Sequence, residues 1–359
     1  MRLLPENKWI QRMLITAATA ITGVALLYEF LFPVPSPPPL PGPFAVGTLT
    51  FEIPAAGEAP PLVTQVWYPT EDASGGAATP WLPDPALVPS FPWQRIGSAQ
   101  SRARDGVAVS KGTLPLLLYE HSWTGHRSEN VALVENLVSR GYVVIAVDHP
   151  GQAARVRYAD GHVVTTRLPD NLNLSTEPSV ASFLKLANDC LDRRLADIAR
   201  VKAALKHGAV PSLSGNLNFE RMGVLGFSFG GTCAIRLCAS DPAFIAGANQ
   251  DGLYLFDDKL RVPFLFFDGE MPAWLLESPT TDENAGQTLT RQAEARIRQA
   301  LHQAGRSRSI IEGTNHASFC DQIFHSRIPR LARAGKRSAA EVHSHLAERL
   351  AVFFGQTIQ

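Results

Sequence analysis

The sequence predicts an α/β fold built on a doubly wound, mostly parallel sheet. From residue 114 onward, short apolar runs alternate with segments of helical periodicity. The apolar runs, among them LPLLLYEH, YVVIAVDH and VPFLFFDG, are continuous rather than alternating. Such runs are typical of parallel strands that are covered on both faces. The repeated strand-then-helix order favours right-handed crossovers within one sheet.

The remaining elements follow in chain order. Residues 44–53 and 62–68 are β-rich and predict an opening hairpin. Helices are expected near 129–139, over 180–207, near 287–304 and near 339–354, the second of these stopping at Gly208. Residues 73–100 are rich in Pro, Gly and Ser and predict a long surface excursion, either a lid or a plain loop.

Composition excludes several classes of function. The chain has 359 residues, 45% of them hydrophobic, and its 33 basic residues balance its 33 acidic ones. This balance leaves no electrostatic footprint for nucleic acid. The four cysteines show no CxxC spacing and are expected to be buried free thiols rather than disulfides. Without a metal-ligand cluster, dinucleotide fingerprint or P-loop, we expect no metal and no cofactor.

The N-terminus carries an apolar stretch, MLITAATAITGVALLYEFLF, over residues 13–32. At about 1.5 Å per residue it matches the roughly 30 Å hydrocarbon core of a bilayer. Basic residues at 2, 8 and 12 predict a cytoplasmic N-terminus over 1–12 and a body exported to the periplasmic or extracellular side. Bulky residues at 28–30 occupy the region where a cleavage site would lie, which favours a retained anchor over a cleaved signal. A buried core helix is the remaining alternative.

A proline-rich segment, PVPSPPPLPGP, follows the apolar stretch over residues 33–43. Such segments are extended and semi-rigid, so we expect a linker that lifts the following domain off the membrane. Residues 44–359 are then left as one folded domain. The sequence carries no signal for its oligomeric state.

The pattern G-x-S-x-G occurs at residues 226–230, with Ser228 at its centre. In a sharp strand-to-helix turn a serine at the apex needs small residues two positions before and after it. MGVLGF precedes the serine as a strand and TCAIRLCA follows as a helix, which is the context that the motif requires. Ser228 is therefore the candidate nucleophile, and 44–359 is predicted to be an α/β-hydrolase domain. A glycine-rich turn with an idle serine is the alternative.

A serine nucleophile needs a base and an acid, which follow it in this fold in the order acid, then histidine. His316 lies in the loop sequence GTNHASF, directly after the last expected strand, and is the candidate base. His325 is the second choice. Asp251 and Asp268 each end a predicted strand, so either carboxylate is placed to orient the imidazole.

The oxyanion formed in acyl transfer needs N–H donors already aimed at it. The residue after the nucleophile supplies one in this fold, which here is Phe229. The second comes from the loop after an earlier strand, here HSWTGH, and we expect it to be the N–H of Trp123.

Four ordered motifs give the chain a family resemblance: EHSWTG with GYVVIAVDH, GFSFGG, QDG and GTNHASF. They resemble the calcium-independent, lipoprotein-associated type of platelet-activating factor acetylhydrolase and its bacterial relatives. The resemblance covers residues 114–355 and implies a triad of Ser228, Asp251 and His316, with Trp123 and Phe229 as the oxyanion pair. It thus favours Asp251 over Asp268. Two departures stand out, because Ser122 replaces a glycine and Phe227 replaces a histidine of the family pattern.

The function implied by the resemblance is hydrolysis of short or oxidised acyl groups from glycerophospholipid-like esters, without calcium. A general carboxylesterase, lipase or polyester hydrolase is the alternative within the same fold. A catalytically idle binding protein is the alternative from another class, because fold alone does not imply activity. The implied partners are a small-molecule or lipid ester and the membrane that holds the N-terminal helix.

Overall fold

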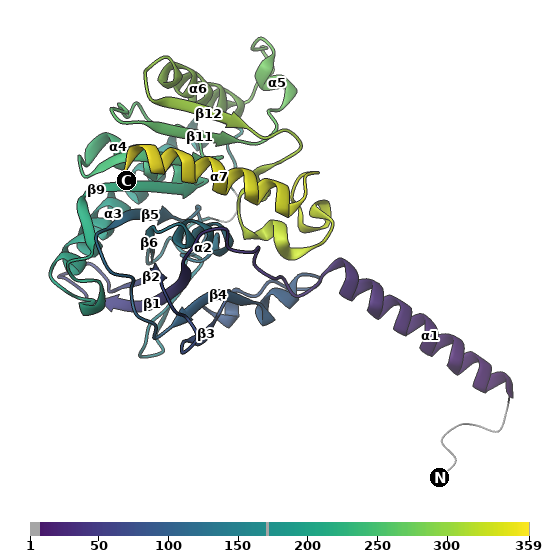
Figure 1. The fold of residues 1–359 in the computed structure, drawn as a ribbon. Helices are drawn as coiled ribbons and strands as arrows, with labels where there is room; N and C mark the ends of the chain where they lie inside the picture. The colour runs from purple at the N-terminus through teal and green to yellow at the C-terminus, as the bar shows by residue number, and fades with distance from the viewer. Residues whose placement is uncertain (1–7, 170–171, 359) are drawn as a thin grey trace.

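The structure is a computed structural model that describes residues 8–169 and 172–358. Its centre is a ten-stranded sheet with the order β12-β11-β10-β9-β5-β6-β2-β1-β4-β3. The strands from β12 to β6 all run parallel, whereas β2 pairs antiparallel with both β6 and β1. The predicted α/β fold with a mostly parallel sheet is therefore confirmed (Figure 1).

The strands and helices have the following bounds. The sheet is built from β1 Ala45–Ile53, β2 Leu62–Thr70, β3 Ala77–Pro80, β4 Gln100–Asp105, β5 Leu114–Glu120, β6 Val143–Asp148, β9 Leu217–Phe227, β10 Phe244–Gln250, β11 Phe264–Asp268 and β12 Arg306–Ile310; β7 Arg155–Arg157 and β8 Val163–Thr165 form a separate ribbon. The helices are α1 Lys8–Leu31, α2 Val131–Ser139, α3 Glu177–Lys206, α4 Phe229–Ser240, α5 Ala273–Leu276, α6 Ala285–Leu301 and α7 Ala339–Thr357.

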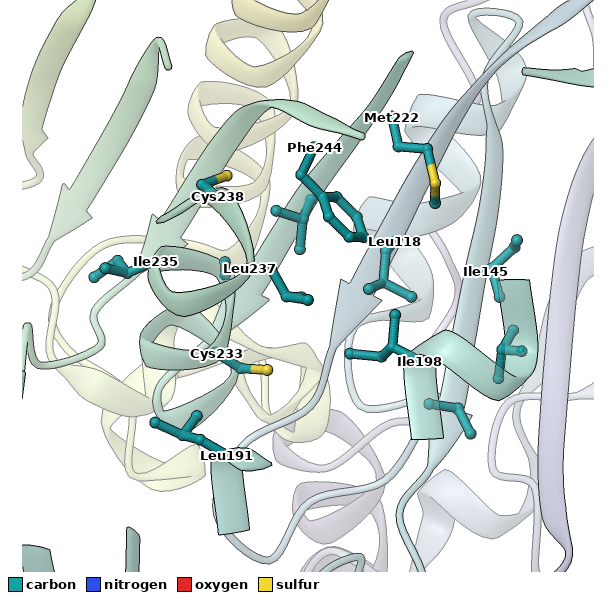
Figure 2. Close-up of a cluster of buried hydrophobic side chains, with 14 of the residues drawn as sticks. Leu118, Ile145, Leu191, Ile198, Met222, Cys233, Ile235, Leu237, Cys238 and Phe244 are labelled. Atoms are coloured by element: carbon teal, nitrogen blue, oxygen red, sulfur yellow. The ribbon is translucent and has the colours of Figure 1, made fainter. Parts of the chain in front are cut away.

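Helices cover both faces of the sheet. Apolar side chains of α3, α4 and α6 pack on one face, and those of α2 and α7 pack on the other. Figure 2 shows part of the first layer, in which Leu191 and Ile198 of α3 and Cys233 of α4 belong to the same buried cluster as Leu118 of β5. All four cysteines are free, as expected. Burial on both faces explains why the parallel strands are apolar throughout.

The opening hairpin is confirmed, with β1 and β2 paired from Ala45 opposite Thr70 to Ile53 opposite Leu62. The segment 73–100 is not the purely exposed excursion that its composition predicts. Trp81 and Ile96 are buried in it, and Trp81 Nε1 donates to Asp321 Oδ2 at 2.6 Å. These buried side chains, together with Asp84, which accepts from Arg155 and Arg157, tie the segment into the domain.

Helix α1 projects from the domain, and none of its residues is buried (Figure 1). It is long and apolar enough to cross a membrane by length and composition alone. Its C-terminal end nevertheless contacts the domain directly. The carbonyl of Leu31 accepts from Ser326 Oγ at 2.7 Å and from the N–H of Arg327 at 3.0 Å. Tyr28 donates to the carbonyl of Pro92 at 3.0 Å and its ring stacks on that of Phe91.

The proline-rich segment 33–43 lies against the domain, and its expected role in lifting the domain off a membrane stays a prediction. Arg102 donates to the carbonyls of Pro37 and Pro38, each at 2.6 Å. Gly42 donates to Ser139 Oγ at 3.2 Å. An extended proline segment leaves its carbonyls free of internal hydrogen bonds, and here an arginine of the domain uses two of them.

We expect Phe354→Ala to lower the free energy of unfolding by about 3–5 kcal/mol, because it leaves a cavity between α7 and the sheet. Phe354 is fully buried and packs against Tyr142. The control is Val352→Ala on the same helix, where the side chain is 57% exposed and the expected change is within about 0.5 kcal/mol. Urea denaturation in non-denaturing detergent measures both. Equal losses in the two variants would contradict this packing.

Candidate active site

Ser228 lies at the sharp turn between β9 and α4. Its backbone has φ 56° and ψ −121°, a conformation that non-glycine residues rarely adopt. Its N–H donates to the carbonyl of Gln250 at 2.8 Å, which ties the turn to the neighbouring strand β10. The turn therefore presents the hydroxyl at the carboxyl edge of the sheet, where a strained serine is held by its surroundings.

The glycines around Ser228 are required by close backbone approaches. A Cβ on Gly226 would lie 2.1 Å from the carbonyl oxygen of Gly230. A Cβ on Gly230 would lie 2.0 Å from the carbonyl oxygen of Glu120, at the end of β5. Both contacts are with backbone atoms, which cannot move aside as a flexible side chain can. The absence of a side chain at these two positions lets α4 begin directly against the ends of β9 and β5.

Ser228, His316 and Asp251 form a continuous chain of hydrogen bonds. His316 Nε2 lies 2.9 Å from Ser228 Oγ, and His316 Nδ1 lies 2.6 Å from Asp251 Oδ2. His316 begins the short 3₁₀ turn His316–Phe319 that follows β12, whereas Asp251 directly follows β10. Three residues far apart in the sequence are thus brought together at one edge of the sheet. The arrangement can remove a proton from the serine hydroxyl and stabilise the resulting imidazolium.

The carboxylate of Asp251 is fixed by its own turn. Asp251 has φ 56°, and its Oδ1 accepts from the N–H of Gly269 at 2.9 Å. The buried side chain of Asn249 holds the turn, because it donates to the carbonyl of Gly252 at 2.7 Å and accepts from its N–H at 2.8 Å. Sequence reasoning missed Asn249. The signal that could have revealed it is the presence of a polar residue inside the apolar strand FIAGANQ.

Asp268 and His325, the alternative acid and base, lie outside the hydrogen-bonded chain of Ser228, His316 and Asp251. Asp268 Oδ2 accepts from Arg308 Nε at 2.8 Å and makes no hydrogen bond to His316. Burial raises the pKa of Asp268 to about 6, against the opposing effect of Arg308. His325 lies in the turn Asp321–His325, and burial lowers its pKa to about 4. It lines a separate hollow with Trp81 and not the cavity at Ser228.

Trp123 and Phe229 adjoin each other beside Ser228, with ring centroids 4.8 Å apart in a T-shaped arrangement. Within the described chain, the backbone N–H of Trp123 donates to no other group. That of Phe229 opens α4, where the first N–H groups of a helix have no internal acceptor. Neither N–H is therefore committed to another group of the described chain, and the oxyanion role of the pair stays a prediction.

The loop that carries Trp123 is held by two ionisable side chains, Glu129 and Arg194, that sequence reasoning also missed. Glu129 accepts from both the N–H and the hydroxyl of Ser122, the residue that replaces the family glycine. Arg194, fully buried on α3, donates to the carbonyls of His121 at 2.7 Å and Ser122 at 3.1 Å. Burial raises the pKa of Glu129 to about 7. The other departure, Phe227, packs its ring 4.7 Å from that of His316.

A cavity of about 500 Å³ opens beside Ser228, Asp251 and His316. Its walls are mostly apolar and include Leu174, Phe183, Leu253, Leu255, Leu275 and Ile297. Its size and character are those of pockets that bind small molecules. No residue of the segment 73–100 lines it, so the lid interpretation of that segment is not supported.

A family model described as platelet-activating factor acetylhydrolase, isoform II, matches residues 35–327. The chain belongs to this family. Two relatives resemble this acetylhydrolase-family chain in sequence. A platelet-activating factor acetylhydrolase of Gallus gallus is 23% identical over 277 residues, which are 65% of each chain. A probable 1-alkyl-2-acetylglycerophosphocholine esterase of Arthroderma benhamiae is 29% identical over 165 residues, 43% of this chain and 38% of the relative. The chain thus spans less than two-thirds of each relative's length.

A solved structure shares the fold of this acetylhydrolase-family chain. It is a ferulic acid esterase from Streptomyces cinnamoneus, with a TM-score of 0.67 and 19% sequence identity. The match covers 90% of this chain and 93% of the esterase. At this identity the likeness concerns the architecture alone.

If the site hydrolyses esters, we expect Gly230→Ala to lower the rate by about 10²-fold, because the added Cβ pushes the start of α4 away from β5 and misplaces Ser228. Overpacking of this kind also costs about 1–3 kcal/mol of stability. Gly75→Ala is the matched control, since nothing lies within 4 Å of its added Cβ. Thermal unfolding and p-nitrophenyl acetate hydrolysis measure both effects. A Gly230→Ala variant with unchanged turnover would show that this approach does not position the serine.

Proposed function

We propose that the chain is a serine carboxyl-ester hydrolase of the α/β-hydrolase fold, with Ser228 as nucleophile, His316 as base and Asp251 as the acid that orients it. The observation that carries the proposal is the hydrogen-bonded chain of these three residues at the mouth of an apolar cavity. The family of the chain supports the same conclusion.

In the proposed reaction, Ser228 Oγ attacks the carbonyl carbon of the ester while His316 Nε2 takes the hydroxyl proton. The carbonyl oxygen becomes an oxyanion, which accepts hydrogen bonds from the N–H groups of Trp123 and Phe229. Collapse of this intermediate breaks the ester C–O bond, and His316 returns the proton to the departing alcohol. Water, deprotonated by His316, then hydrolyses the acyl-enzyme and restores Ser228.

Asp251 is proposed to hold His316 in the tautomer with its proton on Nδ1 and to stabilise the imidazolium. Its second oxygen is occupied by the N–H of Gly269, so the carboxylate has a fixed orientation. Asp268 forms its hydrogen bond with Arg308 instead, so we do not include it in the proposed triad.

For the substrate, we propose a phospholipid-like ester with a short or oxidised acyl group. Support comes from the family and from the names of the two relatives, one an acetylhydrolase and one a probable acetylglycerophosphocholine esterase. A general carboxylesterase or lipase is the second candidate. The cavity of about 500 Å³ favours it, because this volume exceeds what an acetyl group needs.

We further propose that α1 is a retained membrane anchor and that the domain lies on the exported side. Its length, its apolar composition and its complete exposure support a spanning helix. Hydrogen bonds from the domain to the carbonyl of Leu31 mark where the helix would leave the bilayer.

We expect Ser228→Ala and His316→Ala each to lower kcat on the order of 10⁶-fold. Asp251→Asn should lose about 10⁴-fold by disturbing the histidine tautomer, and Asp268→Asn far less. Hydrolysis of p-nitrophenyl acetate measures the losses, and a fluorophosphonate probe should label wild type but not Ser228→Ala. Near-normal turnover of a folded Ser228→Ala variant would end the proposal. Losses in the reverse order for the two aspartates would reassign the acid.

The full chain should stay with membranes after a high-salt wash, because a spanning helix is not released by screening charge. A version that begins at Pro33 should be soluble and active. This starting point keeps the segment that packs on Arg102 and Ser139. N-terminal sequencing of the mature protein provides the deciding measurement. A mature chain that begins beyond residue 32 would show a cleaved signal in place of an anchor.

A further inference from the structure

A cluster of charged side chains lines the apolar cavity beside the proposed triad. It consists of Asp268 at the end of β11, Arg308 on β12 and Glu294 on α6. Arg308 Nε donates to Asp268 Oδ2 at 2.8 Å, and its Nη1 and Nη2 each donate to Glu294 at 2.9 Å. The three side chains are 8–15% exposed. Burying charged groups costs free energy unless each is paired. In this cluster one oxygen of Asp268 is left without a partner.

The guanidinium of Arg308 is engaged along both of its edges, so it has no free fork with which to bind an anion. Asp268 differs from it. Its Oδ2 is bound by Arg308, but within the described part of the chain no group donates to its Oδ1. That oxygen is not among the fully buried atoms without partners, and the residue lines the cavity. Asp268 therefore offers one free acceptor to whatever enters.

The charges around the cavity also favour a donor over an anion as the bound group. Asp251, Asp268, Glu270 and Glu294 line it, and among the described residues Arg308 is the only arginine or lysine that does so. Burial, together with the charge of Asp251, raises the pKa of Asp268 to about 6, so its carboxylate is ionised at pH 7.5. A cavity lined by an excess of carboxylates repels a terminal carboxylate and attracts a donor or a cation.

We infer that the part of the ester that occupies this cavity ends in a hydrogen-bond donor, a hydroxyl or an ammonium, received by Asp268, and that a terminal carboxylate is rejected. The apolar walls contact the intervening chain. The inference rests on the proposed esterase function and adds to it the class of substrate. Asp268 is a specificity-determining residue in this assignment and takes no part in bond breaking.

The test uses four p-nitrophenyl esters of equal chain length: hexanoate, 6-hydroxyhexanoate, 6-aminohexanoate and the monoester of adipate. kcat/KM is measured for wild type, Asp268→Asn and the control Glu312→Gln, which removes a carboxylate that does not line this cavity. Each result is expressed relative to hexanoate in the same variant, so a general loss of activity cancels. Wild type should favour the ammonium ester over the carboxylate ester by at least about tenfold, the size expected for one charge-assisted hydrogen bond.

Asp268→Asn should reduce this preference by about tenfold, whereas Glu312→Gln should keep it. In wild type the preference for ammonium should weaken as the pH falls below about 6, because protonation of Asp268 removes its charge. A wild-type preference for the ammonium ester that persists unchanged in Asp268→Asn would overturn the inference, because another group would then cause it. Equal use of all four esters by wild type would exclude the acyl group from the cavity, and it would overturn the inference if the esters of the second series were also used equally.

A second series carries the terminal groups on the alcohol side, as acetates of butanol, 1,4-butanediol, 4-aminobutanol and 4-hydroxybutanoate. A response to Asp268→Asn in this series alone assigns the cavity to the alcohol, and a response in the first series alone assigns it to the acyl group. No response in either series refutes the inference. Failure of the proposed function is distinct, because wild type would then not hydrolyse p-nitrophenyl acetate at all.

Discussion

The close approach of backbones at residues 226–230 is the constraint on which the site depends. Helix α4 can begin against the ends of β5 and β9 only because Gly226 and Gly230 have no side chains. That approach holds Ser228 in a strained conformation at the first turn of α4. The positions of the sheet, the helix and the nucleophile thus all depend on the absence of side chains at these two glycines. The surrounding core must be rigid enough to maintain this close approach.

Around this turn, buried polar groups act as fixed supports. Asn249 closes the turn that carries Asp251, while Arg194 and Glu129 form hydrogen bonds to the loop that carries Trp123. Each of these groups is costly to bury alone and becomes favourable only when its hydrogen bonds are complete. Their positions explain how loops at the sheet edge, usually the most mobile parts of a domain, hold their geometry. The polar network and the glycine contacts together leave the site little freedom.

Much of the fold was predictable, because buried parallel strands and the elbow have local sequence signatures. Ser228 and His316 lie in short motifs directly after strands, so their meeting follows from the parallel order of those strands. The choice between Asp251 and Asp268 does not follow from spacing, since both end a strand. It depends on which of the two carboxylates Arg308 binds. Arg308 lies forty residues from Asp268 in the sequence, so spacing does not reveal the contact. The expectation that residues 73–100 are purely exposed was wrong, because their composition does not reveal the burial of Trp81 or its hydrogen bond to Asp321. Composition likewise did not reveal the contacts of Arg102 with the segment 33–43.

The seating of α1 on the domain would have a consequence for access to substrate if, as proposed, the helix spans a membrane. A domain on a free tether samples every orientation and meets substrate at a concentration set by the reach of its linker. Here the last turn of the helix is bonded to the domain at Ser326 and Arg327, and the segment after it lies along the surface. In a bilayer such a joint would act as a rigid strut, so the helix tilt would set the height of the cavity mouth. Lipid thickness would then become a determinant of turnover.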